Sequence, residues 1–361
     1  MKKKGKLVWV TGISGCRRKD YLDKWRIFCG KKGKRIKIYN VGQMMFPWAK
    51  QYCGLDLDSR YVLNTPEHTL NAIRGGVFES ILGGEERSRL NRELEEYDAV
   101  VISVHNKFLW KKCMIRAYAS SFLSRFNPDM FVSFVDPSEV ILERLNSREQ
   151  WQGQNLTEDD ILWWQEAEVD STIAFPEWLG MDKKWVAMPS QQPLSFLYFL
   201  LFEPWRPLMY AQMAISHAGA EEEREKKLER IMRFISNVSD FFPILNPLLI
   251  KTGNIEPGTV GTKQDHQTVK RDNKWYIGAC DITIANILEP VFTPGVIDEM
   301  REAQDTNKES WAIFAGGRSP FLEHRLTPER VFQTATDFFK FIKEYQSSLF
   351  KKWERDRGKT K

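Results

Sequence analysis

The segment Val10–Asp20 reads VTGISGCRRKD and directly follows the apolar run Leu7–Val10. A short apolar run, a turn with two glycines and a helical pattern from about Asp20 together indicate a strand, a loop and a helix. Such a loop presents backbone N–H groups and the positive end of a helix to an anion. The segment therefore predicts a parallel α/β sheet with a candidate anion-binding loop at a strand end.

The chain around this segment continues to alternate strands and helices. Short apolar runs separated by helices with polar outer faces are typical of a parallel sheet covered on both sides. We therefore expect a first domain over residues 1–203. The further predicted strands are Arg35–Asn40, Asp98–Ser103, Met130–Val135 and Lys184–Met188, and predicted helices include Glu86–Glu96 and Pro137–Leu145.

A connector with two prolines, Glu203–Pro207, precedes a second strand-first pattern. We expect a smaller flavodoxin- or Rossmann-like α/β domain over residues 206–350 and a basic tail over 351–361. Thr327 and Pro328 predict the start of the last helix, and Gly253–Arg271 reads as a loop near a site. The other predicted elements are the strands Leu208–Ala211, Asp240–Leu245, Ile282–Ile287 and Trp311–Ala315 and the helices Ala220–Ile235 and Val296–Gln304.

The composition, with 42% apolar and 28% charged residues among 361, is that of a globular protein. No apolar run reaches the roughly 18 to 20 residues of a membrane helix. The N-terminus lacks a signal-peptide pattern, so we expect a cytoplasmic protein without a membrane partner. The five cysteines form no C-x-x-C pair, and the five histidines are dispersed. We therefore expect neither a disulfide framework nor a metal site.

The net charge of +5 is small for this length. Basic clusters at Lys2–Lys4, Lys31–Arg35 and Lys351–Lys361 could contact nucleic acid, but such clusters are more often solvated surface. No aromatic and basic binding module is recognisable, so nucleic acid is not the expected partner. The phosphates of a small ligand would use the same charges.

The glycine loop departs from the full phosphate-loop pattern. That pattern needs a glycine, a lysine for the terminal phosphates and a Ser or Thr hydroxyl for magnesium. Counted from Gly12, these positions hold Arg17, Arg18 and Lys19. Gly12 and Gly15 keep the turn, and arginine can supply charge, but no residue replaces the magnesium ligand. The five residues are candidates for phosphate binding.

Residues 5 to 202 resemble the archaeal-type adenylate kinases and related P-loop nucleotide kinases. The similar stretches are VTGISG, NVGQMMFPWAK, DAVVISVHNKF, NPDMFVSFVDPSEVILERL and LTEDDILWWQEAEVDSTIAF, in the same order. The resemblance implies a kinase-like fold with ATP or another nucleotide as the candidate ligand. Within Leu145–Gln154, the lid arginines of that family are reduced to Arg148.

Three interpretations of the loop stay open: an active kinase, a degenerate nucleotide or phosphate sensor, and a structural remnant. Without a hydroxyl for magnesium, the charge neutralisation that phosphoryl transfer needs is missing. The plainest alternative for the three basic residues is an exposed helix start that binds nothing.

Acidic residues in the second half are candidates for catalysis. Asp272 precedes a helical stretch, Asp281 precedes an apolar strand, and Glu299 falls in the first turn of a predicted helix. A helix start favours an ionised carboxylate, and an ionised carboxylate in a cleft can act as a nucleophile. Taken singly, each acid could instead be a cap or a strand end.

The spacing of Gly295, Glu299, Ala303 and Lys308, after Asp272 and Asp281, resembles the nucleoside 2-deoxyribosyltransferases and the related nucleoside 5'-monophosphate N-glycosidases. This resemblance covers Leu208 to about Leu322. It implies that Glu299 attacks the anomeric carbon of a nucleoside or nucleotide and that Asp281 or Asp272 assists the leaving base. It further implies a homo-oligomer, with substrate contacts from Gly295, from Ser216, His217 and Gly219, and from Arg318 and Ser319 on a 5'-phosphate.

Two departures put the substrate in question. The loop AISHAG lacks the aromatic residues that stack the base in some members, and the interval between Asp272 and Asp281 is about one residue longer than the family pattern leads us to expect. The leading hypothesis is a nucleotide-processing enzyme that cleaves or transfers at the N-glycosidic bond. The rivals are a catalytically silent nucleotide sensor and a nucleotide kinase with a regulatory second domain.

Overall fold

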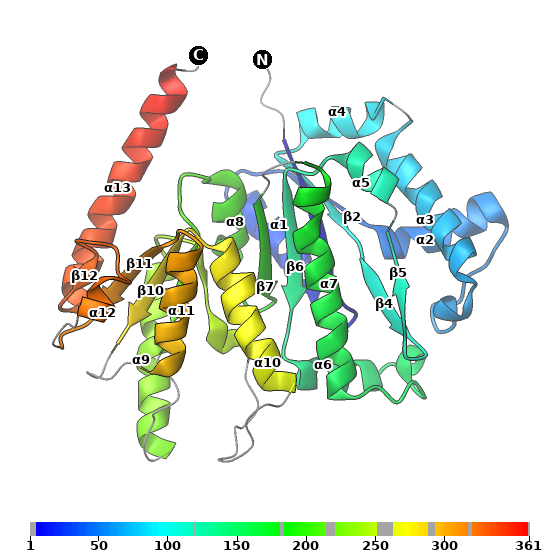
Figure 1. Ribbon diagram of the computed structural model, residues 1–361. Helices are drawn as coiled ribbons and strands as arrows, with labels where there is room; N and C mark the ends of the chain where they lie inside the picture. The colour runs from blue at the N-terminus through cyan, green and yellow to red at the C-terminus, as the bar shows by residue number, and fades with distance from the viewer. Residues whose placement is uncertain are drawn as a thin grey trace. The chain divides into compact units, whose positions relative to one another are not determined.

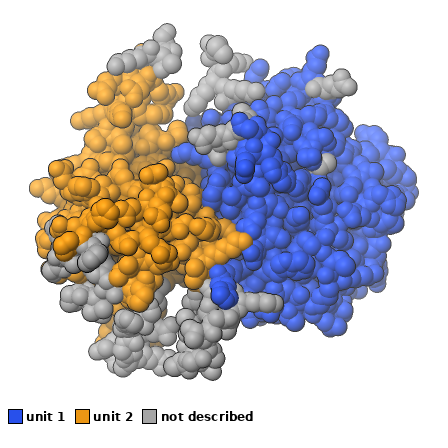
Figure 2. Space-filling model, viewed as in Figure 1, with its two compact units in different colours: residues 1–191, 250–267 blue, residues 192–249, 268–361 orange. Residues whose placement is uncertain are grey.

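The computed structural model describes residues 5–84, 86–118, 120–180, 184–213, 221–250, 263–287, 293–316 and 320–359. The chain forms two compact units (Figures 1 and 2), one of residues 1–191 and 250–267 and the other of residues 192–249 and 268–361. Helix α8 (Leu194–Phe202), which the sequence analysis places in the first domain, groups with the second unit. None of the helices in the described ranges has the length and apolarity needed to cross a membrane.

The first unit contains a parallel five-stranded sheet in the order β2-β3-β1-β6-β7. The first strand, β1, lies at its centre and leads into the glycine loop, so the loop lies at the carboxyl edge of the sheet. All five strands coincide with predicted ones. They are β1 (Lys6–Gly12), β2 (Ile36–Asn40), β3 (Ala99–Ser103), β6 (Met130–Val135) and β7 (Lys184–Pro189).

Helices connect these strands, and a small antiparallel hairpin of β4 (Lys107–Trp110) and β5 (Cys113–Arg116) follows β3. Helix α7 begins with a reciprocal cap, in which the Thr157 hydroxyl and the Asp160 carboxylate bind each other's backbone N–H groups. The helices of this unit are α1 (Arg18–Lys31), α2 (Val41–Cys53), α3 (Glu67–Leu82), α4 (Ser88–Glu96), α5 (Ser120–Phe126), α6 (Ser138–Asn146) and α7 (Glu158–Trp178), with 3-10 turns η1 (Val62–Asn64) and η2 (Glu149–Trp151).

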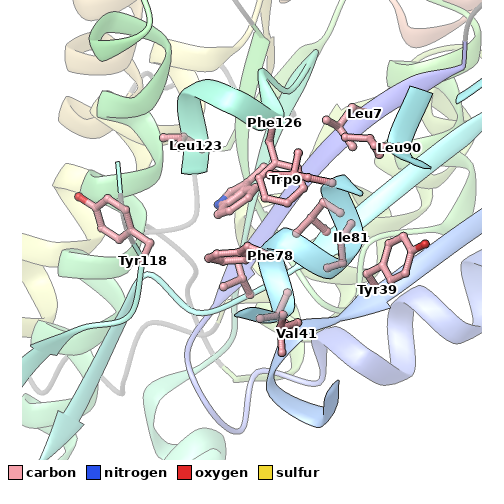
Figure 3. Close-up of a cluster of buried hydrophobic side chains, with 14 of the residues drawn as sticks. Leu7, Trp9, Tyr39, Val41, Phe78, Ile81, Leu90, Tyr118, Leu123 and Phe126 are labelled. Carbon is pink, nitrogen blue, oxygen red and sulfur yellow. The ribbon is translucent and has the colours of Figure 1, made fainter. Parts of the chain in front are cut away.

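A core of aromatic and aliphatic side chains covers one face of this sheet (Figure 3). The Trp9 ring from β1 lies 5.9 Å from Phe78 of α3 and 5.6 Å from Phe126 of α5. All three side chains are fully buried. Aromatic contacts of this kind add to the burial of apolar area, so the core fixes α3 and α5 against the strand that carries the glycine loop.

The second unit has its own parallel sheet, in the order β12-β11-β10-β8-β9. Numbered along the chain from β8, the order is 2-1-3-4-5, which is that of flavodoxin. The predicted fold class, a parallel α/β domain followed by a second α/β domain of flavodoxin-like strand order, is confirmed. The strands are β8 (Met209–Gln212), β9 (Ile244–Leu245), β10 (Ile282–Asn286), β11 (Glu309–Ile313) and β12 (Val331–Phe332).

The two faces of the second sheet carry different helices. Met209, Ala211 and Met213 pack in one cluster with α9 (Glu221–Ser239) and α13 (Ala335–Lys359). Ala285 and Ala312 pack on the opposite face with α11 (Pro294–Asp305). The remaining elements are the 3-10 turn η3 (Pro247–Leu249), α10 (Lys263–Lys270), the π-helical turn η4 (Arg271–Ile277) and α12 (Pro320–Glu323).

The predicted start of the last helix is wrong. The Thr327 hydroxyl accepts a hydrogen bond from the Ser310 N–H at 2.9 Å, so it joins strand β11 rather than capping a helix. Helix α13 begins at Ala335, after Thr334 caps the Asp337 N–H at 3.1 Å, and it continues through the predicted tail to Lys359. Val331 and Phe332, predicted as helical, form β12.

Two other predictions are corrected. Of the predicted strand Asp240–Leu245, only Ile244 and Leu245 pair with β8. Residues 263–270 of the predicted loop form α10, while residues 251–262 lie outside the described ranges.

Candidate functional sites

The glycine loop is held by hydrogen bonds to side chains of helices α6 and α7. The Gly12 N–H donates to Glu168 at 3.0 Å, and the Gly15 carbonyl accepts from Arg144 at 2.7 Å. Both glycines have positive φ, +144° and +90°, which other residues rarely adopt. A Cβ on Gly12 would also lie 2.8 Å from the Cys16 sulfur. The loop therefore needs both glycines, as predicted from the sequence.

The three basic residues of the loop have different environments. Arg18 donates from Nη1 to the carbonyls of Gly12, at 2.8 Å, and Val104, at 2.6 Å, and so joins the ends of β1 and β3. Arg17 is exposed, and Lys19 is exposed and paired with Asp23 at 2.9 Å. Of the three, only Arg18, at the position of the phosphate-loop lysine, is half-buried and bonded to the strand ends, and partial burial lowers the pKa of its guanidinium.

Helix α7 contributes two buried polar side chains, Glu168 and Thr172, that bond the glycine loop region and were not predicted from the sequence. Both oxygens of the buried Glu168 accept backbone hydrogen bonds, from Gly12 at 3.0 Å, Asn106 at 2.9 Å and Lys107 at 2.7 Å. Burial raises the pKa of Glu168, while these N–H donors and the charge of Arg18 oppose the rise. Thr172, one turn later, bonds Thr11 at 2.8 Å. A signal was present, because both are polar residues on the apolar face of a helix.

A second missed residue is Arg74 of α3, which is only 6% exposed. It donates to Asn71, but it forms no ion pair with any described carboxylate. Burial lowers its pKa to about 10. The pKa of His105 is held well below 6.5 by burial and by the charges of Arg18 and Arg74. A buried guanidinium group, that of Arg74, and a half-buried one, that of Arg18, therefore act on one neutral imidazole, an arrangement that an anion would stabilise.

Arg144 links the loop to β6. Its Nη1 binds both the Gly15 carbonyl and the Asp136 carboxylate, and Asp136 accepts a further bond from Ser190 at 2.6 Å. Burial raises the pKa of Asp136. Arg148, the arginine that the sequence analysis singled out nearby, is exposed.

The second unit holds a polar cluster between its sheet and α11. The Tyr210 hydroxyl donates to Glu299 Oε1 at 2.8 Å. Glu299 Oε2 is enclosed and has no hydrogen-bond partner among the described residues. Thr293 caps α11 and Pro294 occupies its first turn, which sets the helix register so that Glu299 shares the inner side with Val296 and Met300.

Burial and the charge of Asp272 raise the pKa of Glu299 well above 4.5, while Tyr210 and Arg271 oppose the rise. The expectation that a helix start keeps Glu299 ionised is therefore wrong. Glu299 is the sixth residue of α11 rather than a first-turn residue, and the helix effect falls off within the first turn. Burial then decides which protonation state is favoured.

The π-helical turn η4 brings Asp272 into this cluster. Asp272 accepts two hydrogen bonds from Arg271, at 2.8 and 3.1 Å. Burial works against the charge of Arg271, but Asp272 still raises its pKa. Cross-links fix η4 to α11: Asn273 bonds Asp298 at 3.2 Å and Lys274 bonds Glu302 at 2.7 Å. Turns of this kind are frequent at functional sites.

Asp281 has a different neighbourhood. Its Oδ2 accepts a hydrogen bond from the Leu208 N–H at 2.8 Å, just before the first residues of β8 and β10. This places it at the amino edge of the sheet. Gly295 lies in the first turn of α11, with open space around its Cα. The other predicted substrate contacts, Ser216, His217, Gly219, Arg318 and Ser319, lie outside the described residues.

No protein-family model matches the chain, and no curated protein matches it either. Among solved structures, the crystal structure of shikimate kinase from Bacteroides thetaiotaomicron is similar over 64% of this chain and 98% of that chain, with 9% sequence identity and a TM-score of 0.29. The fold of each unit is defined by its own strand order, β2-β3-β1-β6-β7 in the first and β12-β11-β10-β8-β9 in the second.

Proposed function

We propose that the second unit binds a nucleoside or nucleotide and cleaves or transfers at its N-glycosidic bond, with Glu299 as the nucleophile. The observation that carries this proposal is the hydrogen bond from Tyr210 to Glu299 Oε1, which leaves the enclosed Oε2 without a partner. A carboxylate oriented through one oxygen can attack with the other. Asp272 adds negative charge beside it.

In this reaction Glu299 Oε2 forms a bond to the anomeric carbon as the carbon–nitrogen bond breaks. The bonding pair leaves with the base, which takes a proton from solvent, and a glycosyl ester remains on the enzyme; the attacking water or second base gives a proton back to solvent in the next step. Water or a second base then attacks the same carbon and releases Glu299. Positive charge develops on the sugar in the transition state, and the carboxylates of Glu299 and Asp272 stabilise it.

The raised pKa of Glu299 has a consequence for this mechanism. The nucleophile is the ionised carboxylate, but burial favours the protonated form in the free protein. Base release should therefore rise with pH through the pKa of Glu299. A decline over the same range would instead identify Glu299 as a proton donor.

The test is incubation of the full chain with pooled ribo- and deoxyribonucleoside 5'-monophosphates, followed by chromatography for free base. We expect release by the wild type and loss of at least about a thousandfold in Glu299→Gln, because the amide cannot form the ester. Glu354→Gln, an exposed change on α13, is the matched control. Unchanged release in Glu299→Gln would refute the assignment.

A second candidate function concerns the first unit, for which we propose phosphate binding without phosphoryl transfer. Support comes from the buried Arg74 and the half-buried Arg18, neither of which forms an ion pair among the described residues. The triphosphate of ATP or another nucleotide is the candidate anion. Position 19 carries lysine in place of a hydroxyl for magnesium, so we expect no phosphate transfer from ATP in the presence of magnesium.

The same two assays, for free base and for ligand binding, also distinguish the proposed enzyme from a catalytically silent nucleotide sensor. A sensor would show ligand-dependent shifts in melting temperature without free base or any other product. The homo-oligomer implied by the family resemblance stays a prediction, which sedimentation of the full chain would test with and without nucleotide.

A further inference from the structure

Gln212 is the last residue of β8 and is only 1% exposed. Neither its amide oxygen nor its amide nitrogen has a hydrogen-bond partner among the described residues. Buried polar side chains are nearly always paired, and an amide can both donate and accept. An enclosed amide with both groups unused therefore points to a ligand that supplies a donor and an acceptor together.

The strand geometry places this amide on the face of Glu299. Side chains alternate along a strand, and Met209, Ala211 and Met213 pack on the face of α9 and α13. Tyr210 and Gln212 therefore share the opposite face, that of α11. The register agrees, because Gln212 pairs with Ala285, which packs in the cluster of α11.

The position along the strand is also that of a ligand site. Gln212 lies two residues beyond Tyr210, about 7 Å further toward the carboxyl edge of the sheet. The strand order reverses between β8 and β10, and ligands of open parallel sheets bind at the carboxyl ends of the strands where the order reverses. Tyr210, which binds the nucleophile, and Gln212 are therefore successive residues on the same face of β8 at that position.

The stereochemistry of displacement identifies what the amide would meet. A nucleophile attacks the anomeric carbon from the side opposite the leaving base. In a β-nucleoside, the 2'- and 3'-hydroxyls project from that same side of the sugar ring. Each hydroxyl is both a donor and an acceptor, which matches the two unused groups of Gln212.

We infer that Gln212 binds the sugar hydroxyls on the nucleophile's side and makes the substrate a ribonucleoside or ribonucleotide rather than its 2'-deoxy form. This inference rests on the proposed function of Glu299. With a 2'-deoxy sugar the enclosed amide loses a partner, and sites built to bind a hydroxyl strongly reject the analogue that lacks it. Hydrogen bonds to the 2-hydroxyl also strengthen in the transition state of glycosyl transfer.

The main test compares kcat/KM for base release from AMP and dAMP and from CMP and dCMP, in the wild type and in Gln212→Met. Methionine has nearly the same shape but no amide. We expect the wild type to prefer the ribonucleotide of whichever pair it accepts by about tenfold or more, and the variant to lose most of that preference through slower ribonucleotide cleavage. Equal rates in the wild type, or an unchanged preference in Gln212→Met, would overturn the inference.

A binding experiment separates this inference from the proposed function. In the Glu299→Gln background, calorimetry would compare ribose 5-phosphate with 2-deoxyribose 5-phosphate, with and without Gln212→Met. A ribose preference that depends on Gln212 supports the sugar contact even if no nucleotide releases its base. Base release without a Gln212-dependent preference refutes the sugar contact and leaves the function of Glu299 intact. Absence of both release and sugar binding refutes both.

Discussion

The Tyr210 hydroxyl donates a 2.8 Å hydrogen bond to Glu299, which lies 89 residues further along the chain. The bond joins the second residue of β8 to the inner side of α11 and leaves one carboxylate oxygen unpaired. Burial and Asp272 raise the pKa of this carboxyl group. Because Glu299 is costly to ionise in the folded protein, its ionisation affects both stability and activity, and the two effects can be measured separately.

Glu299→Gln should stabilise the protein at alkaline pH. Because the folded state raises the pKa of Glu299, its stabilising contribution is complete below the unfolded value of about 4.5 and is lost as pH rises through the folded value. The amide keeps the hydrogen bond from Tyr210 and never ionises. Urea unfolding should therefore show a higher midpoint for the variant at pH 8 and a similar midpoint at pH 4.5. A variant less stable than the wild type at pH 8 would contradict the buried acid.

Tyr210→Phe should reduce base release and shift its pH dependence. Loss of the hydroxyl leaves the ionised carboxylate of Glu299 with one fewer donor, and a hydrogen bond to a charged group contributes about 1.5–3 kcal/mol. This corresponds to roughly a tenfold to hundredfold loss near neutral pH. The rising limb of the pH–rate profile should also move to higher pH.

A merely structural role for Tyr210 would lower stability without moving that limb. Tyr345→Phe is the matched control, since Tyr345 is a partly buried tyrosine of α13. Its pH–rate profile should coincide with that of the wild type.

The sequence was sufficient for elements with a strong local pattern. The five strands of the first sheet are short apolar runs, and the glycine loop has its own turn residues, so both were predicted. Tertiary contacts decided the last helix, because Thr327 has the composition of a cap but bonds Ser310 of β11. The Thr327 hydroxyl could either cap a helix or bond the strand. The local sequence indicates only the cap, because the strand partner is brought close only in the folded sheet.

In the candidate sites too, residues with a local sequence pattern were predicted and residues that depend on distant contacts were not. Glu299 was found from its spacing to Gly295 and Ala303. Tyr210, Arg74 and Glu168 were missed, because each acquires its role from a partner far away in sequence or from burial without an ion pair. The charges of Arg17, Arg18 and Lys19 looked equivalent, and only the backbone carbonyls around Arg18 separate it from its neighbours.

That separation predicts different costs of substitution within the loop. Arg18→Met removes the donor shared by the Gly12 and Val104 carbonyls, so we expect a loss of about 2–4 kcal/mol in the free energy of unfolding. Lys19→Met removes an exposed i,i+4 ion pair with Asp23 and should leave the urea midpoint almost unchanged, because water and salt screen such a pair. Urea unfolding of both variants measures the difference. Equal costs would show that Arg18 does not join β1 to β3.

Arg74→Met should raise stability in the absence of anions and abolish stabilisation by them. The wild type buries a guanidinium group without an ion pair, and methionine removes that charge while filling much of the space. Inorganic phosphate or pyrophosphate should raise the melting temperature of the wild type. At a ligand concentration a hundred times the dissociation constant, binding adds about 2.7 kcal/mol to the free energy of unfolding. The variant should melt higher without phosphate and gain nothing from it. Arg17→Met, at an exposed position of the loop, should respond to phosphate like the wild type. Loss of the response in Arg17→Met but not in Arg74→Met would place the anion at the outer loop and refute a site at Arg74.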